Sequence, residues 1–87
     1  MKTIIFDENC TAWTRNIDYN LMFLGMQANY IKDQFIHRGY VYLNQIYEAF
    51  GVAWNPGMVN SCYLLKSGPI KFEFEPVSDV AIVIKVS

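Results

Sequence analysis

Five apolar residues recur at spacings of three, four, three and four in the first half of the chain, and they constrain the fold more than any other feature. They are Leu21, Leu24, Ala28, Ile31 and Phe35. This spacing places all five on one face of a helix, which must pack against another element. Met22, Met26 and Tyr30 are expected to widen that face.

The ends of this helix are indicated by capping residues. Asp18 is the predicted N-cap, because a carboxylate there accepts hydrogen bonds from the unpaired amides of the first turn. Gly39 is the predicted C-terminal cap, because glycine adopts a left-handed conformation at little cost. The sequence therefore predicts a long helix over residues 18–38.

A second helix is expected almost at once, within "HRGYVYLNQIYEAFG" at residues 37–51. Four apolar residues recur there at helical spacing and predict a short helix over about 43–50: Leu43, Ile46, Tyr47 and Phe50. Asn44 is expected to cap its start and Gly51 its end. Packing and capping account for these residues, so the stretch is interpreted as a tight corner rather than an active site.

The last third of the chain changes to the two-residue period of strands. "IKFEFE" at 70–75 alternates between apolar and charged residues and predicts a half-buried strand. "VAIVIKV" at 80–86 is apolar on both faces, which is typical of a central strand. "SCYLLK" at 61–66 precedes the turn residues "SGP" and is the first of three predicted C-terminal strands.

These elements predict an α+β fold in one compact domain, residues 1–87. Two consecutive helices pack on a small antiparallel sheet of three C-terminal strands, and residues 2–6 are a possible N-terminal strand. A chain of 87 residues needs a dense core, and 53% hydrophobic residues supply one.

Composition argues against several classes of protein. A formal net charge of −1 gives neither a basic nucleic-acid footprint nor a strongly acidic surface. The apolar run after Lys2 is too short for a secretory signal, and no stretch approaches the length of a membrane span. Cys10 and Cys62 are expected to be reduced thiols in a cytoplasmic protein.

The residues that carry chemistry form no recognisable catalytic or metal-binding pattern. His37 is the only histidine, and in the last turn of a helix its charge complements the helix end. One histidine and two cysteines are too few for a structural zinc site. We therefore expect no catalytic residue, no cofactor and no metal, and a protein that is not an enzyme.

Aromatic residues and methionine exceed what two helices and a small sheet need. Trp13 and Trp54 fall in irregular segments, and such residues are favoured at interface cores. Trp13 with Arg15, and Trp54 with Met58, are the predicted partner-binding residues. The alternative is that both tryptophans fold back as lids on the core.

Residues 21–52 carry a pattern of helix followed by Arg38-Gly39, Val41, Leu43-Asn44, Tyr47 and Phe50-Gly51. The pattern resembles a family of small uncharacterised proteins carried on mobile elements of Gram-positive bacteria. Phe50 stands where that family usually has leucine, and the end of this chain, "PVSDVAIVIKVS", departs from the family's aspartate- and glycine-rich segments. The resemblance implies a plasmid- or phage-linked origin and carries over no catalytic residue.

The protein expected from these features is a non-enzymatic protein-binding accessory module of a bacterial mobile element. Its surplus apolar surface would also allow it to form a homodimer that hides this surface. A narrower alternative is an anti-defence inhibitor, similar to an anti-CRISPR protein, that binds a host nuclease complex. A second alternative is a small nucleic-acid-binding regulator that uses the helical pair, and a small enzyme is the third.

Overall fold

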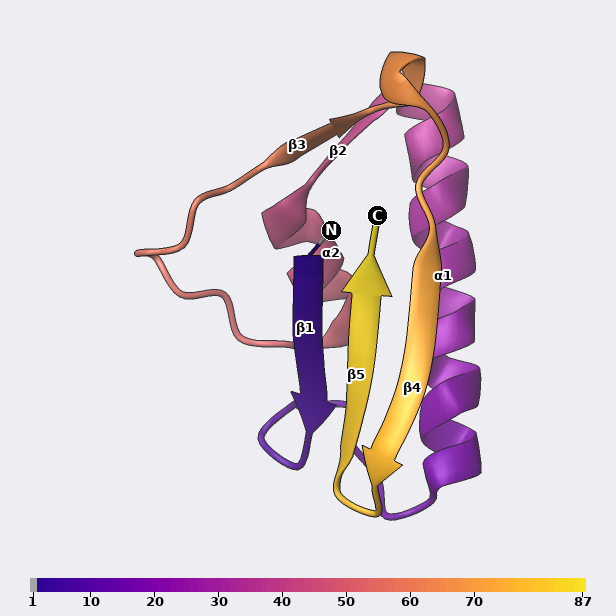
Figure 1. Cartoon of the computed structure of the whole chain (residues 1–87), viewed down its shortest axis with the longest axis vertical. Helices are drawn as coiled ribbons and strands as arrows, with labels where there is room; N and C mark the ends of the chain where they lie inside the picture. Colours follow the sequence, from indigo (N-terminus) through magenta and orange to yellow (C-terminus); the bar gives the residue numbers. More distant parts are fainter. Residues whose placement is uncertain (1) are drawn as a thin grey trace.

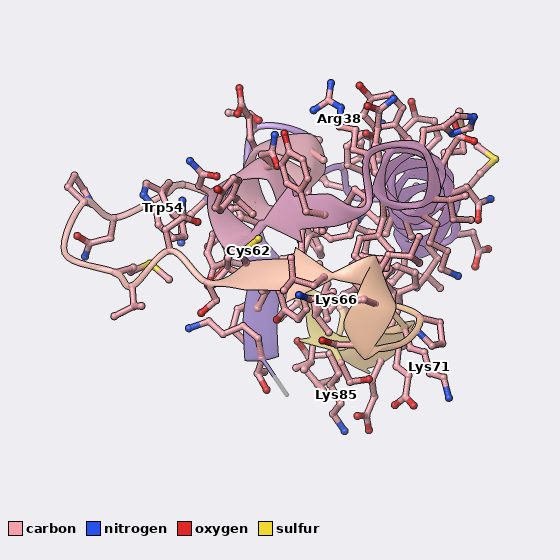
Figure 2. All side chains as sticks on the ribbon, turned by 90° about the horizontal axis from the view of Figure 1, so that it is seen from above. Arg38, Trp54, Cys62, Lys66, Lys71 and Lys85 are labelled. Atoms are coloured by element: carbon pink, nitrogen blue, oxygen red, sulfur yellow. The ribbon has the colours of Figure 1, made fainter. Side chains whose placement is uncertain are left out.

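The computed structural model describes residues 2–87 and confirms the α+β fold. Its elements follow one another in this order: β1 (Lys2–Asp7), α1 (Ile17–Arg38), β2 (Tyr40–Tyr42), α2 (Leu43–Phe50), β3 (Cys62–Leu64), a 3-10 helix (Leu65–Ser67), β4 (Phe72–Ser78) and β5 (Ala81–Val86). Both helices lie on one face of the main sheet, which gives two layers (Figures 1 and 2). No helix in the described part of the chain has the length and apolar character that crossing a membrane requires.

The main sheet is antiparallel and has the order β1-β5-β4. The predicted N-terminal strand is thus present, and the last strand is the central one, as its two apolar faces indicate. In β5 every second side chain is buried toward the helices: Ile82, Ile84 and Val86. The opposite face of the sheet carries charged groups, including Lys85, whose Nζ lies 3.4 Å from a carboxylate oxygen of Glu75 (Figure 2).

The strand predicted at 61–66 does not join this sheet. It is shorter, spans Cys62–Leu64, and pairs antiparallel with β2 in a separate two-stranded sheet. Backbone hydrogen-bonding groups of β2 need partners once α1 has ended. β3 supplies them, and the Leu65 N–H extends the pairing by donating to the Gly39 carbonyl at 2.9 Å. The 3-10 helix then separates β3 from β4, so these strands form no hairpin.

The apolar stripe of α1 forms the centre of the core. Leu24, Ala28, Ile31 and Phe35 are buried, while Leu21 is half-buried at the edge. The prediction that Met22, Met26 and Tyr30 widen this face is wrong, because their side chains are 56%, 63% and 58% exposed. The helix therefore has further apolar surface that faces away from the core.

At the helix ends, the two predicted C-terminal caps are confirmed and the two predicted N-terminal caps are wrong. Asn16, not Asp18, is the N-cap of α1, and its Oδ1 accepts a hydrogen bond from the Tyr19 N–H at 3.1 Å. Asp18 lies in the first turn, where its negative charge still suits the positive helix end. Gly39 and Gly51 end the two helices with φ of 81° and 72°, as predicted.

The start of α2 is capped from a distant segment rather than by Asn44. The Asn44 N–H donates to Oδ1 of Asn60 at 2.9 Å, and the Leu43 N–H donates to the Ser61 carbonyl at 2.8 Å. Within α2, Oε1 of Gln45 accepts from the Tyr42 N–H at 2.9 Å. The loop between α2 and β3 thus returns to the first turn of α2 and fixes where that helix begins.

One polar side chain lies wholly inside the core. Asn20 is 0% exposed, and its Nδ2 donates to the Thr14 carbonyl at 2.9 Å. Its Oδ1 accepts from the Thr14 N–H at 3.0 Å and from the Thr14 hydroxyl at 2.7 Å. These hydrogen bonds offset the cost of burying the amide and hold the connection between β1 and α1 against the helix.

Substitution at the apolar stripe tests the placement of α1. Leu24→Ala should lower the free energy of unfolding by about 2–5 kcal/mol, because it leaves a cavity in a fully buried site. Leu65→Ala removes the same atoms from a side chain that is 39% exposed and should cost less than about 1 kcal/mol. Urea unfolding followed by circular dichroism measures both, and equal losses would contradict the core assignment.

The two cap glycines should differ in their tolerance of alanine. Gly39 has open space around an added Cβ, so Gly39→Ala should cost only the strain of positive φ, about 1–2 kcal/mol. At Gly51 an added Cβ would lie 2.8 Å from the Thr11 hydroxyl oxygen, so Gly51→Ala should cost more. In a Thr11→Ala background the excess should fall, as thermal unfolding can measure. Equal costs at both glycines would show that the contact with Thr11 has no effect.

Candidate functional site

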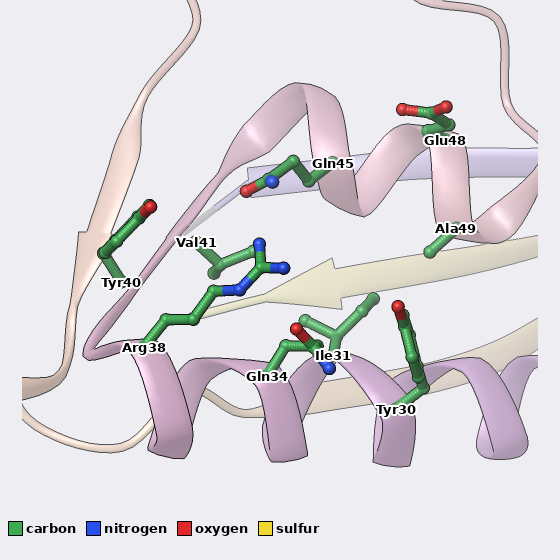
Figure 3. A pocket seen from close by; sticks show the side chains of 9 residues that line it. All are labelled: Tyr30, Ile31, Gln34, Arg38, Tyr40, Val41, Gln45, Glu48 and Ala49. Carbon is green, nitrogen blue, oxygen red and sulfur yellow. The ribbon is translucent and has the colours of Figure 1, made fainter.

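A groove runs between α1 and α2 on the side of the helices away from the main sheet (Figure 3). Its volume is about 320 Å³. Nine residues line it: Tyr30, Ile31, Gln34, Arg38, Tyr40, Val41, Gln45, Glu48 and Ala49. We call it the interhelical groove.

The tight corner after α1 creates this groove. Gly39 ends α1, three residues of β2 follow, and α2 begins at once. α2 therefore runs beside the second half of α1, with β2 closing one end of the space between them (Figure 3). Val41 of β2 is buried beneath this end, while Tyr40 and Tyr42 are 40% and 42% exposed, with ring centroids 5.7 Å apart.

The groove has an apolar floor and polar walls. Ile31 and Val41 are buried and form the floor together with half-buried Ala49. Side chains with polar ends form the walls: Tyr30, Gln34 and Arg38 from α1 and Gln45 from α2, with the Glu48 carboxylate at the outer rim (Figure 3). A floor that excludes water beneath polar walls is the usual construction of a binding site.

Two side chains of opposite charge border the groove, Arg38 from α1 and Glu48 from α2. The Arg38 guanidinium extends from α1 over the groove toward Gln45 of α2, whereas the Glu48 carboxylate lies further along α2, at the outer rim of the groove on the side away from α1 (Figure 3). Within residues 2–87 neither side chain forms an ion pair. The hydrogen-bond capacity of both therefore remains available to a bound molecule, with five N–H donors on the guanidinium and two acceptor oxygens on the carboxylate.

The chemistry of the groove suits recognition. Its polar groups are one guanidinium, one carboxylate, two amides and two phenols. Together they match a polypeptide segment, which presents both donors and acceptors beside apolar side chains. His37 points elsewhere, with its Nδ1 2.8 Å from the Asp33 carbonyl oxygen and 3.4 Å from Oδ1 of Asp33.

None of the four predicted partner-binding residues lines the interhelical groove. Trp13 is half-buried, and its ring centroid lies 5.6 Å from that of Phe6. Arg15 is exposed nearby in sequence. The structure thus packs the first tryptophan onto the core, as the lid alternative expects, and its contact with a partner stays a prediction.

Trp54 and Met58 belong to the long loop between α2 and β3, which extends from the body of the protein (Figure 1). Both are half-buried against the core, and the Trp54 ring lies 5.2 Å from the ring of Tyr47 in an edge-to-face arrangement. Val59, next along this loop, is 80% exposed. The interaction of Trp54 and Met58 with a partner likewise stays a prediction.

Sequence reasoning missed the groove, although one signal was present. Tyr30, Gln34 and Arg38 follow one another at spacings of four, which places them on a single face beside the apolar stripe. Gln45 and Glu48 are three apart on the polar side of α2. Only the angle of the corner at Gly39 shows that these two polar faces meet.

The cysteines lie in different environments and both are free thiols. Cys62 is exposed, whereas Cys10 is buried, and burial raises the pKa of the Cys10 thiol. The Asp7 N–H donates to Cys10 Sγ at 3.5 Å, an opposing effect on the pKa that burial outweighs. In the described part of the chain no group of three His, Cys, Asp or Glu side chains could hold a metal ion.

Thiol modification should separate the two cysteines. In the native protein one thiol should react rapidly with Ellman's reagent, because Cys62 is exposed, whereas Cys10 is buried and burial raises the pKa of its thiol. Unfolding should release the second thiol. Cys62→Ser should remove the rapid phase and Cys10→Ser should keep it. Rapid reaction of two thiols in the native protein would contradict the burial of Cys10.

Residues 1–59 match a family of unknown function (DUF6353). This span contains every residue that lines the interhelical groove, together with β1, α1, β2 and α2. The strands β4 and β5, which complete the main sheet, lie beyond it. Comparison with the curated proteins and with the solved structures gave no match.

Proposed function

The chain belongs to this family of unknown function, which brings no activity with it, and we therefore propose a function from the geometry of the groove. The protein is a non-enzymatic protein-binding accessory module of a bacterial mobile element. Its interhelical groove holds a segment of a partner protein. The observation that carries the proposal is the Arg38 guanidinium over an apolar floor, without an ion-pair partner within residues 2–87, with the equally unpaired Glu48 carboxylate at the outer rim of the groove. A partner segment that buried these charges would supply the ion pairs they lack within residues 2–87.

Binding rather than catalysis is supported by the groups that line the groove. They include no serine, cysteine or histidine that could act as a nucleophile or proton carrier beside Glu48. Arginine and tyrosine, by contrast, are the residue types that most often dominate protein interfaces. Arg38, Tyr30 and Tyr40 line the groove together and are the residues we expect to contribute most.

The mobile-element part of the proposal is supported by the resemblance of residues 21–52 to proteins carried on such elements. An anti-defence inhibitor that binds a host nuclease complex is a narrower form of the same proposal. Small size and a recognition groove suit an inhibitor that blocks a surface of such a complex, and identification of the partner distinguishes the two forms.

A nucleic-acid-binding regulator is less well supported. Arg38 lies beside the helices, while Lys66, Lys71 and Lys85 lie at other positions around the molecule (Figure 2). Phosphate binding requires a continuous basic surface and weakens steeply as salt rises. The dispersed cations and a net charge of −1 favour a protein partner over a nucleic acid.

A pull-down from a host lysate with a high-salt wash tests the groove directly. The wild-type protein should retain a stoichiometric partner, identified by mass spectrometry, and the double variant Arg38→Ala, Glu48→Ala should lose it. With the purified partner, Arg38→Ala alone should weaken binding at least about tenfold, because a desolvated arginine at an interface centre is a frequent hot spot.

The matched control changes the same kinds of charge on the outer face of the main sheet. Lys85→Ala with Glu75→Ala removes one cation and one carboxylate far from the groove and should leave binding unchanged. A partner kept by the groove variant but lost on Arg15→Ala or Met58→Ala would move the interface to the predicted residues. Recovery of nucleic acid alone, lost in the salt wash, would support the regulator instead.

A further inference from the structure

α1 has a second regular surface, on the flank opposite the interhelical groove. Its residues recur at spacings of four, three, four, three and four: Asp18, Met22, Gly25, Asn29, Lys32 and Ile36. We call these six residues the outer face of α1. All are exposed except half-buried Gly25, and no element lies beyond this side of the helix until its C-terminal end, where residues 65–70 come beside Lys32 and Ile36 (Figure 1).

The residues of the outer face lie on one flank over five turns of α1, so a single neighbouring helix can contact them all. Alternation of three and four residues keeps one stripe in register with a neighbouring helix over several turns. Met22 and Ile36 leave 56% and 64% of their surface exposed, and Met26 on the border of the face leaves 63%. Met22 and Met26 lie one turn apart and Ile36 lies near the end of the helix, so exposed apolar side chains stand at two places along this flank.

The charges on the outer face complement those of a second outer face whose helix runs in the opposite direction. Asp18 lies seven residues before Gly25, and Lys32 lies seven residues after it. Among residues 2–87 neither of them forms an ion pair. We propose that the outer face binds a second copy of this chain, with the two α1 helices antiparallel and a two-fold axis at Gly25.

This axis brings Asp18 of each copy opposite Lys32 of the other. Seven residues of helix span about 10 Å, so the carboxylate of one copy and the ammonium of the other come to the same level along the paired helices. The two ion pairs are related by the symmetry of the dimer. They also select the antiparallel arrangement, because a parallel pair would set Asp18 against Asp18.

The residues near the axis suit close packing. Gly25 has nothing within 4 Å of where a Cβ would stand, so a second helix can approach closely there. Met22 lies three residues before the axis and Met26 one residue after it, toward the same edge of the face. Measured along the helix axes, Met22 of each copy therefore lies about 3 Å from Met26 of the other. Four flexible methionine side chains can then fill the space over the axis.

The one uncharged polar residue of the outer face also finds a partner in this arrangement. Asn29 lies four residues after the axis, so it comes within one helical turn of the other copy's Asp18. Its amide can donate a hydrogen bond to that carboxylate, beside the ion pair with Lys32. A polar residue that is satisfied in only one register helps to fix that register.

An apolar hollow extends the outer face at the C-terminal end of α1. Its volume is about 420 Å³, and Lys32 and Ile36 form one wall while Leu65 and Pro69 form the other. Because it continues the outer face, the dimer can bury more than a single helix stripe and approach the roughly 1,000 Å² that a specific interface needs. The interhelical grooves face elsewhere and stay open, so this inference stands independently of the proposed function.

Charge reversal tests the dimer and its register together. Sedimentation velocity at micromolar concentrations should give twice the chain mass of 10.1 kDa for the wild type. Asp18→Lys or Lys32→Asp alone sets like charges against each other and should weaken self-association at least about tenfold. The double variant Asp18→Lys, Lys32→Asp should restore the dimer. Glu8→Lys reverses an exposed charge in the turn after β1, away from the outer face, and should leave the dimer unchanged.

A monomeric wild type at these concentrations would overturn the proposal, as would a double variant no tighter than the single ones. Circular dichroism of each variant establishes that the fold is retained. All of the substituted side chains are exposed, so the expected losses concern association rather than folding.

A cysteine at the axis provides a second readout. In a Cys62→Ser background, Gly25→Cys should form an intermolecular disulfide on mild oxidation, because a residue on a two-fold axis faces its own copy. Asn29→Cys is the matched control. Its copies would lie about 12 Å apart along the antiparallel helices, beyond the reach of a disulfide. Cross-linking that is equal at both positions would contradict the axis at Gly25.

Discussion

The pairing of the first strand with the last is the constraint on which the rest of the structure depends. β1 and β5 are antiparallel, in a register that runs from Lys2 opposite Val86 to Asp7 opposite Ala81. Ile4, Phe6, Ile82 and Ile84 thereby share one apolar face of the sheet, each at most 2% exposed. The stripe of α1 is buried against this face, so the long helix has its core partner only when both ends of the chain have met (Figure 1).

The corner at Gly39 then determines where the interhelical groove lies. Gly39 ends α1 with φ of 81°, and its carbonyl accepts a hydrogen bond from Leu65, which holds β3 against β2. The same loop returns to the first turn of α2 through Asn60 and Ser61. The position of α2 beside α1 therefore depends on hydrogen bonds that residues 60–65 make both to the corner at Gly39 and to the first turn of α2.

Much of this fold could be predicted because its signals are local. The stripe from Leu21 to Phe35, the alternation at 70–75 and the two apolar faces at 80–86 each determine an element from its own residues. The prediction at Asp18 failed because Asn16 and Asp18 are both good caps, and only the exit angle of the preceding connection selects between them.

The features that could not be predicted depend on segments far apart in the sequence. Nothing in "SCYLLK" shows whether it pairs with β4 or with β2, because a short strand fits either edge. The interhelical groove likewise arises from two polar helix faces that only the tertiary structure brings together.

The two parts of the chain contribute differently to the core and to the two surfaces proposed to bind partners. The family match ends at residue 59, and both the interhelical groove and the outer face of α1 lie before that point. The segment after it contributes β4 and β5, which bury the apolar side of the helices. Any apolar sheet of the right shape can bury a helix stripe, whereas a groove depends on particular side chains such as Arg38 and Glu48. The identity of the side chains is therefore less constrained in the last third of the chain than in the helical pair. A partner would recognise this protein by side chains of its two helices.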